Sequence, residues 1–491
     1  MQSIDNVVGS HGTNVVPDVV WLGDNHRDGR NLSCNSCAHG SHRRAVIRRT
    51  AVTASSEEES SRIFARTMHP AYAIPLLLAV WSGWVALAHH RVPPFVDQWI
   101  FLGDYQRLLR DGWSLHWLFA AQNEHRIATS RPFFVADLEW FGGRNDLLIA
   151  IIGLTQLCTA WLFLRLARFP VSGLRALGAA LGLSLLFLLT QNQNFLQGFQ
   201  IQFVGVFAVG GWAIWLFCSS LDGTIRWRRL LAAWALLAVA TFTMANGFMA
   251  GFAMLAVGTL WRRPLVALFG TAIVTAILAI AYCAGLHTAG GGLQNALSHP
   301  LKAMIYVAAY LGGIWAPLSW RAAAVVGAGG LLGGSTFALS RMRQLSAQEA
   351  ALLGIMTFIA LSAAATAVGR LQLGLTQALQ SRYMTPSAYF WAAMIILLTG
   401  YLNTEAIQRG VRAATYAGLV VLGPLQWIGS VESAGWSAEM DREAVVLRSG
   451  QDDGGAIRDL SHGAPQILAQ PAMNARSLAI LRTHRLNVFA P

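Results

Sequence analysis

The sequence predicts an all-α polytopic membrane protein, and three observations support that fold class. Apolar stretches of about 17 to 22 residues recur along the chain, which is the length needed to cross a hydrocarbon core. Hydrophobic residues make up 54% of the 491 residues and charged residues only 12%. The apolar stretches are continuous rather than short and alternating, which argues against a transmembrane β-barrel.

About eleven of these stretches, within a range of about 10 to 12, are expected to be transmembrane helices. They cover residues 72–88, 147–164, 174–190, 203–219, 230–245, 247–261, 264–285, 322–340, 350–368, 387–402 and 411–428. A further apolar piece, 301–317, is interrupted by Gly312, Gly313 and Pro317, and we expect it to be re-entrant or peripheral.

Arginines set the predicted orientation. The short loops around Arg165–Arg175, Arg226–Arg229 and Arg262–Arg263 are expected in the cytoplasm, because cytoplasmic loops are enriched in basic residues. The same rule accounts for the formal net charge of +12 without a nucleic-acid partner. The N-terminus is then cytoplasmic and the C-terminus external, in the inner membrane of a bacterium.

Residues 1–67 are polar, and we expect them to form a disordered cytoplasmic extension. Met68 stands directly before the first span, so it is an alternative start of the protein. The segment contains CNSCAHGSH, whose Cys and His residues are of the right types for zinc but too closely spaced for a usual finger. The sequence therefore predicts no metal site there, and the five cysteines imply no disulfide framework.

The membrane domain, 68–430, includes a long first external loop at 89–146, and residues 431–491 are expected to form a short external tail. The loop is too long to be only a connector. Within it, QWIFLGDYQRLLRDG spaces Trp99, Leu102, Tyr105 and Leu109 at helical intervals, and RPFFVADLEWFGG begins near a proline and ends at paired glycines. Two amphipathic helices on the outer membrane surface are predicted.

Polar residues gather at the expected outer ends of the spans. The loop contains Asn123, Glu124, His125 and Arg126 side by side, and QNQNFLQGFQIQ at 191–202 and GRLQLGLTQALQSRY at 369–383 are expected on the same face. The spans themselves contain essentially no ionisable residue. An ion-coupled transporter would be expected to bury charges at mid-membrane depth, so this pattern disfavours transport.

The order of these parts resembles the GT-C superfamily of integral membrane glycosyltransferases, which includes protein mannosyltransferases and the lipid A aminoarabinose transferase. The resemblance covers about residues 70 to 430. More specifically, the chain is similar to a set of bacterial membrane proteins with an acid followed by Trp, an NEHR cluster, an N…GFQ stretch and an SRY motif. Here these are Asp97 with Trp99, Asn123–Arg126, Asn194 with Gly198–Gln200, and Ser381–Tyr383.

The resemblance implies a donor sugar on a polyprenyl phosphate, transferred to an envelope acceptor on the external face. Asp97 would be the general base, with Glu124 as a second catalytic candidate. His125, Arg126 and Arg382 would bind the lipid phosphate, and Asn123, Gln200 and Tyr383 would complete the substrate-binding set. Many such enzymes have an acid pair near the first span, whereas this chain has Asp97–Gln98, which leaves open whether a divalent metal is needed.

Each of these residues also has an ordinary structural interpretation. Asp97 would cap the helix that follows it, and Glu124 with Arg126 would be a local ion pair. Arg382 beside Tyr383 would be an interfacial anchor. Asn194, Gln197 and Gln200 would join spans by hydrogen bonds.

Two classes of function remain after these observations. The first is the glycosyltransferase, whose partners would be the lipid-linked sugar and membrane lipid. The alternative is a non-enzymatic membrane protein, such as a flippase or an assembly partner in surface polysaccharide biogenesis. A flippase would need a polar path through the spans, whereas this sequence places its polar residues at one face.

Overall fold

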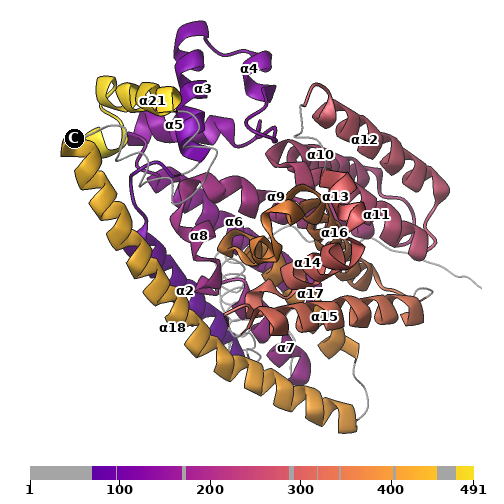
Figure 1. Cartoon of the computed structure of the whole chain (residues 1–491). Coiled ribbons are helices and arrows are strands. Elements are labelled where there is room, and N and C mark those ends of the chain that lie inside the picture. Colours follow the sequence, from indigo (N-terminus) through magenta and orange to yellow (C-terminus); the bar gives the residue numbers. More distant parts are fainter. Residues whose placement is uncertain are drawn as a thin grey trace, which may run out of the picture. The chain divides into compact units, whose positions relative to one another are not determined.

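The computed structural model describes residues 69–95, 97–168, 173–286, 292–317, 319–341, 344–401, 405–449 and 471–490. The chain divides into two compact units, and all of these residues lie in the second, Ala65–Pro491. In this part of the chain the regular structure is helical, with one isolated β-bridge and no strand (Figure 1). The predicted fold class, an all-α polytopic membrane protein, is confirmed.

Eight helical stretches among the described residues are long and apolar enough to cross a membrane, and each coincides with a predicted span. They are Pro70–His89 with α2 (Ala73–His89), α6 (Asp146–Leu166), Gly173–Leu196 with α7 (Gly173–Leu185) and α8 (Asn192–Leu196), Gly198–Ser220 with α9 (Ile201–Ser220), α12 (Leu265–Cys283), α15 (Trp320–Arg341), Ala347–Leu373 with α16 (Ala347–Arg370), and Arg412–Ser449 within α18 (Glu405–Ser449).

The other three predicted spans are also helices, but they are not among these eight: α10 (Trp227–Thr243), α11 (Met249–Leu260) and α17 (Met384–Tyr401). The interrupted segment 301–317 contains the short helix α14 (Pro300–Leu311), preceded by α13 (Gly292–Ser298). At roughly 1.5 Å per residue α14 is about 18 Å long, which is less than the thickness of a hydrocarbon core.

Helix α14 packs closely on α15 because two glycines remove the side chains between them. A Cβ atom at Gly312 would lie 1.8 Å from the carbonyl oxygen of Ala323, and one at Gly327 would lie 1.9 Å from that of Ala308. Small residues at a helix crossing let the two backbones approach, which is the usual way apolar helices associate in membranes.

The third span is broken near its end, after α7. Residues 186–200 form short pieces, η2 (Leu189–Gln191), α8 and η3 (Gly198–Gln200), and nearly all of them are buried. Side chains from other helices satisfy the freed backbone groups: Gln156 Nε2 donates to the carbonyl of Leu186 at 2.8 Å, and Gln426 Oε1 accepts from the amide of Leu189 at 3.0 Å. Such partners are what permits an interrupted helix in apolar surroundings.

The long loop folds into α3 (Asp97–Asp111), α4 (Leu115–Phe119) and α5 (Arg131–Phe141), so both predicted loop helices are present. Gly142, with φ of +65°, ends α5 at the first of the paired glycines. Trp99, Leu102 and Tyr105 are buried as their spacing predicts, whereas Leu109 is exposed and Leu108 takes the inner position. These helices contribute to a second hydrophobic core, which we call the loop core and which also includes residues of α2, α6, α8 and α9.

The C-terminal helix α21 (Pro471–Thr483) contributes to this loop core and packs against α3 (Figure 1). Ser477 Oγ donates to the carbonyl of Trp99 at 3.0 Å, and Asn487 Nδ2 donates to that of Gly143 at 2.8 Å. Helix α18 continues without interruption past the predicted end of its span, to Ser449. The described residues of the tail, 431–449 and 471–490, are therefore on the same side of the bundle as the loop, and α21 is part of the loop structure.

A buried ion pair lies in the loop core. Arg131, with a fully buried side chain, donates from Nη2 to Asp104 Oδ2 at 2.5 Å, and the Asp104 side chain is 5% exposed. The Arg131 guanidinium lies 4.9 Å from the ring centroid of Trp117, whose Nε1 donates to the Asp104 carbonyl at 2.8 Å. The pair joins α3, α4 and α5 in one contact.

We expect Arg131→Met to destabilise the loop by about 3 kcal/mol, because it removes the buried partner of Asp104 and leaves that carboxylate only its ion pair with the exposed Arg107. Hydrogen exchange of α3 to α5 in the purified protein measures this loss. The matched control is Arg110→Met, which removes an exposed pair with Asp111 and should leave exchange unchanged. Adding Asp104→Leu to Arg131→Met should restore much of the protection, and a double variant no better than the single one would contradict this interpretation.

Candidate functional site

Asp97 is the first residue of α3, and the side chains of Gln122 and Asn123 donate hydrogen bonds to it. Its Oδ1 accepts a hydrogen bond from Asn123 Nδ2 at 2.9 Å, and its backbone carbonyl accepts from Gln122 Nε2 at 3.2 Å. The carboxyl group is therefore fixed by a neighbour about 25 residues further along the chain, at the base of the loop core.

The NEHR segment forms a tight turn. The backbones of Gln122 and His125 exchange hydrogen bonds of 2.7 Å and 3.0 Å, which leaves Asn123 and Glu124 at the tip. Asn123 has a φ of +51°, in the left-handed region that Asn tolerates better than most residues. This conformation presents the Asn123 amide to Asp97 and the Glu124 carboxylate to the membrane helices.

Arg126 fastens the turn to the bundle. Its Nε donates to the carbonyl of Tyr282 at 2.8 Å, and its two terminal nitrogens donate to the carbonyls of Phe119 and Ala284. The Tyr282 hydroxyl in turn accepts from the Arg126 amide at 3.0 Å. With its guanidinium directed to backbone carbonyls, Arg126 positions the loop, and the predicted ion pair with Glu124 does not form.

Glu124 instead pairs with Arg370, whose Nη2 lies 3.2 Å from Glu124 Oε2. Arg370 is the last residue of α16, so its charge also interacts favourably with the carboxyl end of that helix. Sequence reasoning placed the segment 369–383 on this face but did not select Arg370. Arg370 stands at the end of an apolar run that is expected to end on the external side, where basic residues are less common than in the cytoplasm. That unusual position was the signal that could have pointed to a role for Arg370.

Arg382 lies in η8 (Ser381–Tyr383), directly before α17, and its backbone is held by the broken helix. Asn194 Nδ2 donates to the Arg382 carbonyl at 3.0 Å, and Ser381 Oγ donates to the carbonyl of Thr190 at 2.9 Å. The guanidinium lies 5.4 Å from the Tyr383 ring centroid and 5.9 Å from that of Phe203. In the described part of the chain it has no carboxylate within ion-pair distance.

Several of these residues influence the pKa of Asp97. Burial raises the pKa of Asp97 above its usual value, and Arg382, the Asn123 amide and Arg370 oppose that rise, while nearby Glu124 adds to it. The structure thus brings the predicted residues Asp97, Asn123, Glu124 and Arg382 into one cluster, together with Arg370. We call these five residues the loop-face cluster.

His125 lies beside the same cluster but does not add a charge to it. Burial, together with the positive charges of Arg370 and Arg382, lowers its pKa to about 4, so the ring is neutral at neutral pH. Its Nδ1 is buried without a hydrogen-bond partner among the described residues. His125 can therefore offer a neutral hydrogen bond, whereas the cations come from the arginines.

Gln200 and Tyr383, which were predicted in the substrate-binding set, are not members of the loop-face cluster. Gln200 Nε2 donates to Gln197 Oε1 at 3.2 Å, and its own Oε1 is buried without a partner among the described residues. Tyr383 is buried, with its ring centroid 5.1 Å from that of Tyr310. Asn194 joins elements as its ordinary interpretation predicts, since its Nδ2 also donates to Thr385 Oγ1 at 2.7 Å.

The described residues include no group of three or more His, Cys, Asp or Glu that could hold a metal ion. Asp97 and Glu124 are the two carboxylates of the loop-face cluster. The CNSCAHGSH motif lies outside the described residues.

No protein-family model matches the chain, and no curated protein or solved structure matches it. The chemistry of the loop-face cluster is therefore argued from its own geometry and charges.

Proposed function

We propose that this membrane protein is a glycosyltransferase that moves a sugar from a polyprenyl-phosphate donor to an envelope acceptor. The observation that carries the proposal is the loop-face cluster, in which the Asp97 carboxyl is held by Asn123 and lies in the field of Arg370 and Arg382. A buried carboxyl group near two arginines, of which only Arg370 is paired with the second carboxylate Glu124, suits a reaction that removes a proton and releases a lipid phosphate.

In the proposed reaction Asp97 takes the proton of the acceptor hydroxyl. The acceptor oxygen then forms a bond to C1 of the sugar, and the bond from C1 to the phosphate oxygen breaks, with its electron pair leaving on the lipid phosphate. A carboxyl group whose pKa is raised is a stronger base once ionised, which favours proton removal.

The departing phosphate needs cations that stay protonated, and we assign this role to Arg382 with Arg370. Arg382 has a guanidinium without a carboxylate partner in the described chain, so its two-pronged hydrogen-bonding edge is available for phosphate oxygens. Arg370 is shared with Glu124, which holds it at the cluster and offsets part of its charge. Asn123 orients the Asp97 carboxyl group through its hydrogen bond, and Glu124 positions the Arg370 guanidinium through the ion pair.

We derive no step through a divalent cation, since the residues above supply both the base and the phosphate-binding charges. Asp97 and Glu124 are the ligands that a cation at this position would use first.

We further propose that the loop face is external and that the opposite ends of the helices are cytoplasmic in a bacterial inner membrane, because basic residues gather at those opposite ends. A cysteine at Gln372 should react with an impermeant thiol reagent in intact cells, whereas one at Gln344 should not. Both positions are exposed on the protein, so access from outside decides the result. Labelling at Gln344 with protection at Gln372 would reverse the orientation.

We expect Asp97→Asn to lower sugar transfer at least about a hundredfold without loss of folded protein, which is the usual scale for removing a general base. The measurement is turnover of radiolabelled polyprenyl-phosphate hexoses and pentoses by the purified protein. Transfer by the variant at the wild-type rate would rule out Asp97 as the base, and the absence of transfer by the wild-type protein would favour a non-catalytic role in polysaccharide assembly.

The pH profile gives an independent readout of the same residue. The base must be ionised, so kcat/KM should rise with pH through a pKa above the ordinary carboxyl value of about 3.9. Asn123→Gly keeps the left-handed backbone but removes the hydrogen bond that lowers this pKa, so it should move the rise to higher pH. A pH profile identical to that of the wild-type protein would mean that Asn123 does not influence the pKa of the base.

We expect Arg382→Lys to raise the donor KM roughly tenfold, because it keeps the charge but loses the paired hydrogen bonds. Arg370→Gln should also raise the donor KM, and the double variant should cost less than the two single losses combined if both hold one phosphate. His125→Gln is the matched control, since a neutral ring is replaced by a neutral amide. An unchanged donor KM in both arginine variants would mean that the donor phosphate does not bind at this cluster.

A further inference from the structure

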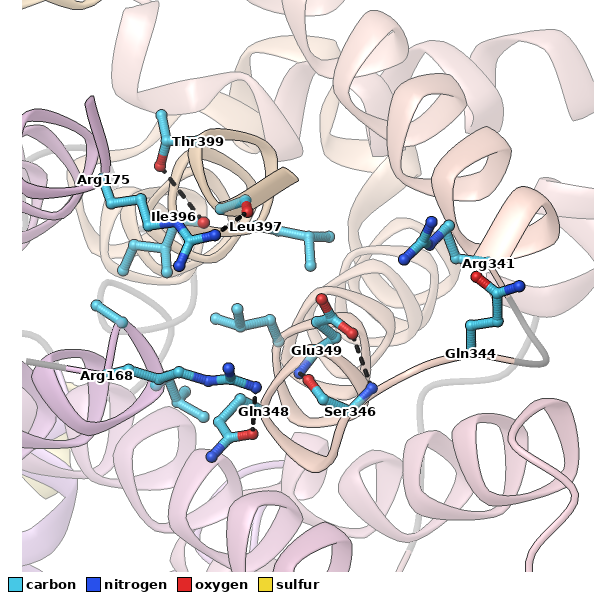
Figure 2. A pocket seen from close by; sticks show the side chains of 14 residues that line it. Arg168, Arg175, Arg341, Gln344, Ser346, Gln348, Glu349, Ile396, Leu397 and Thr399 are labelled. Carbon is cyan, nitrogen blue, oxygen red and sulfur yellow. Dashed lines mark hydrogen bonds between the residues drawn. The ribbon is translucent and has the colours of Figure 1, made fainter. Parts of the chain in front are cut away.

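A cavity of about 370 Å³ lies at the ends of the helices opposite to the loop-face cluster (Figure 2). It is formed where α6 and α17 end and where α7 and α16 begin, together with the last turn of α15. The loop-face cluster lies where α16 ends and just before α17 begins, so these two helices separate the sites. The lining residues are Leu166, Ala167, Arg168, Arg175, Arg341, Gln344, Ser346, Gln348, Glu349, Leu352, Ile396, Leu397, Thr399 and Gly400.

Three arginines surround this cavity, and Glu349 is the single carboxylate among its lining residues. Figure 2 shows Arg168 and Arg175 on one side and Arg341 on the other, with Glu349 between them. The cavity therefore has a net positive lining.

Two of the arginines, Arg168 and Arg175, are held in place by hydrogen bonds to uncharged partners. Arg168 Nη2 donates to Gln348 Oε1 at 3.1 Å, and Arg175 Nη2 donates to the carbonyl of Gly400 at 3.0 Å. Both partners are uncharged, so the charges of Arg168 and Arg175 remain uncompensated by these contacts. Each guanidinium has further N–H groups that are able to bind an anion.

Glu349 has a structural role that accounts for its presence. It forms a capping box with Ser346 at the start of α16: its Oε2 accepts from the Ser346 amide at 2.7 Å, and Ser346 Oγ accepts from the Glu349 amide at 3.4 Å. The amino end of this helix carries a partial positive charge, which adds to that of the arginines.

We propose that this cavity binds a phosphate-bearing ligand, supplied either by the headgroup of an anionic lipid or by a soluble phosphate. Guanidinium groups from separate helices suit phosphate oxygens, and the apolar wall of Leu352, Ile396 and Leu397 suits the carbon chain of an ester. The site does not depend on the proposed glycosyltransferase reaction. Basic residues at helix ends are also expected from membrane orientation alone, and the experiment separates that ordinary role from binding.

The experiment measures ligand binding to the full-length purified protein in an uncharged detergent. One arm titrates inorganic phosphate and follows heat release, and the other detects phosphatidylglycerol retained from nanodiscs of phosphatidylcholine with and without phosphatidylglycerol. The variants are Arg168→Gln and Arg175→Gln. The matched control is Arg165→Gln, which removes the same charge from the same end of α6, where Arg165 lies against the rings of Trp161 and Trp215 outside the cavity.

We expect each cavity variant to weaken binding roughly tenfold, as for the loss of a charge-assisted hydrogen bond, and the control to leave it unchanged. Glu349→Gln keeps a capping-box side chain but removes the opposing charge, so it should tighten binding. Binding of phosphate itself identifies a soluble source, and retention of phosphatidylglycerol alone identifies a lipid source. If neither probe binds, or if Arg165→Gln weakens binding as much as the cavity variants, the proposal is wrong.

Discussion

The fold depends on satisfying the backbone of the broken third span in apolar surroundings. A continuous helix would need no help, but residues 186–200 leave amide and carbonyl groups that water cannot reach. Gln156, Gln191 and Gln426 supply those bonds, and Asn194 and Ser381 extend the network to the SRY motif. The interruption therefore fixes the position of Arg382, so the geometry of the loop-face cluster follows from a requirement of folding.

The helices were predictable from the sequence because burial in lipid demands long apolar runs, and the loop helices because their capping and spacing signals are local. The cluster was predictable in part: Asp97, Asn123, Glu124 and Arg382 come together. Arg370 was missed because its partner Glu124 lies 246 residues away, and the direction of Arg126 could not be foreseen because Tyr282 and Ala284 lie more than 150 residues from it. Local patterns carry no information about such contacts.

The two ends of the bundle use arginine in different ways. At the loop face Arg370 is paired with a carboxylate, and three nitrogens of Arg126 donate to backbone carbonyls, so these two arginines have few N–H groups left for an anion. At the opposite end Arg168 and Arg175 contact neutral groups and line a cavity. The number of basic residues therefore does not indicate whether an anion can bind. The groups that already contact each arginine decide this.

The contribution of α21 to the loop core has a consequence for biosynthesis. The loop leaves the ribosome early, but the contacts of Ser477 and Asn487 with its backbone form only after these residues have been made, 378 residues after Trp99 and 344 residues after Gly143. Since domains usually fold from the N-terminus as they emerge, Asp97 and its neighbours would wait with an incomplete core while the intervening helices insert. Maturation of this region is thus linked to the synthesis of α21, and a chain that stalls before α21 would remain immature.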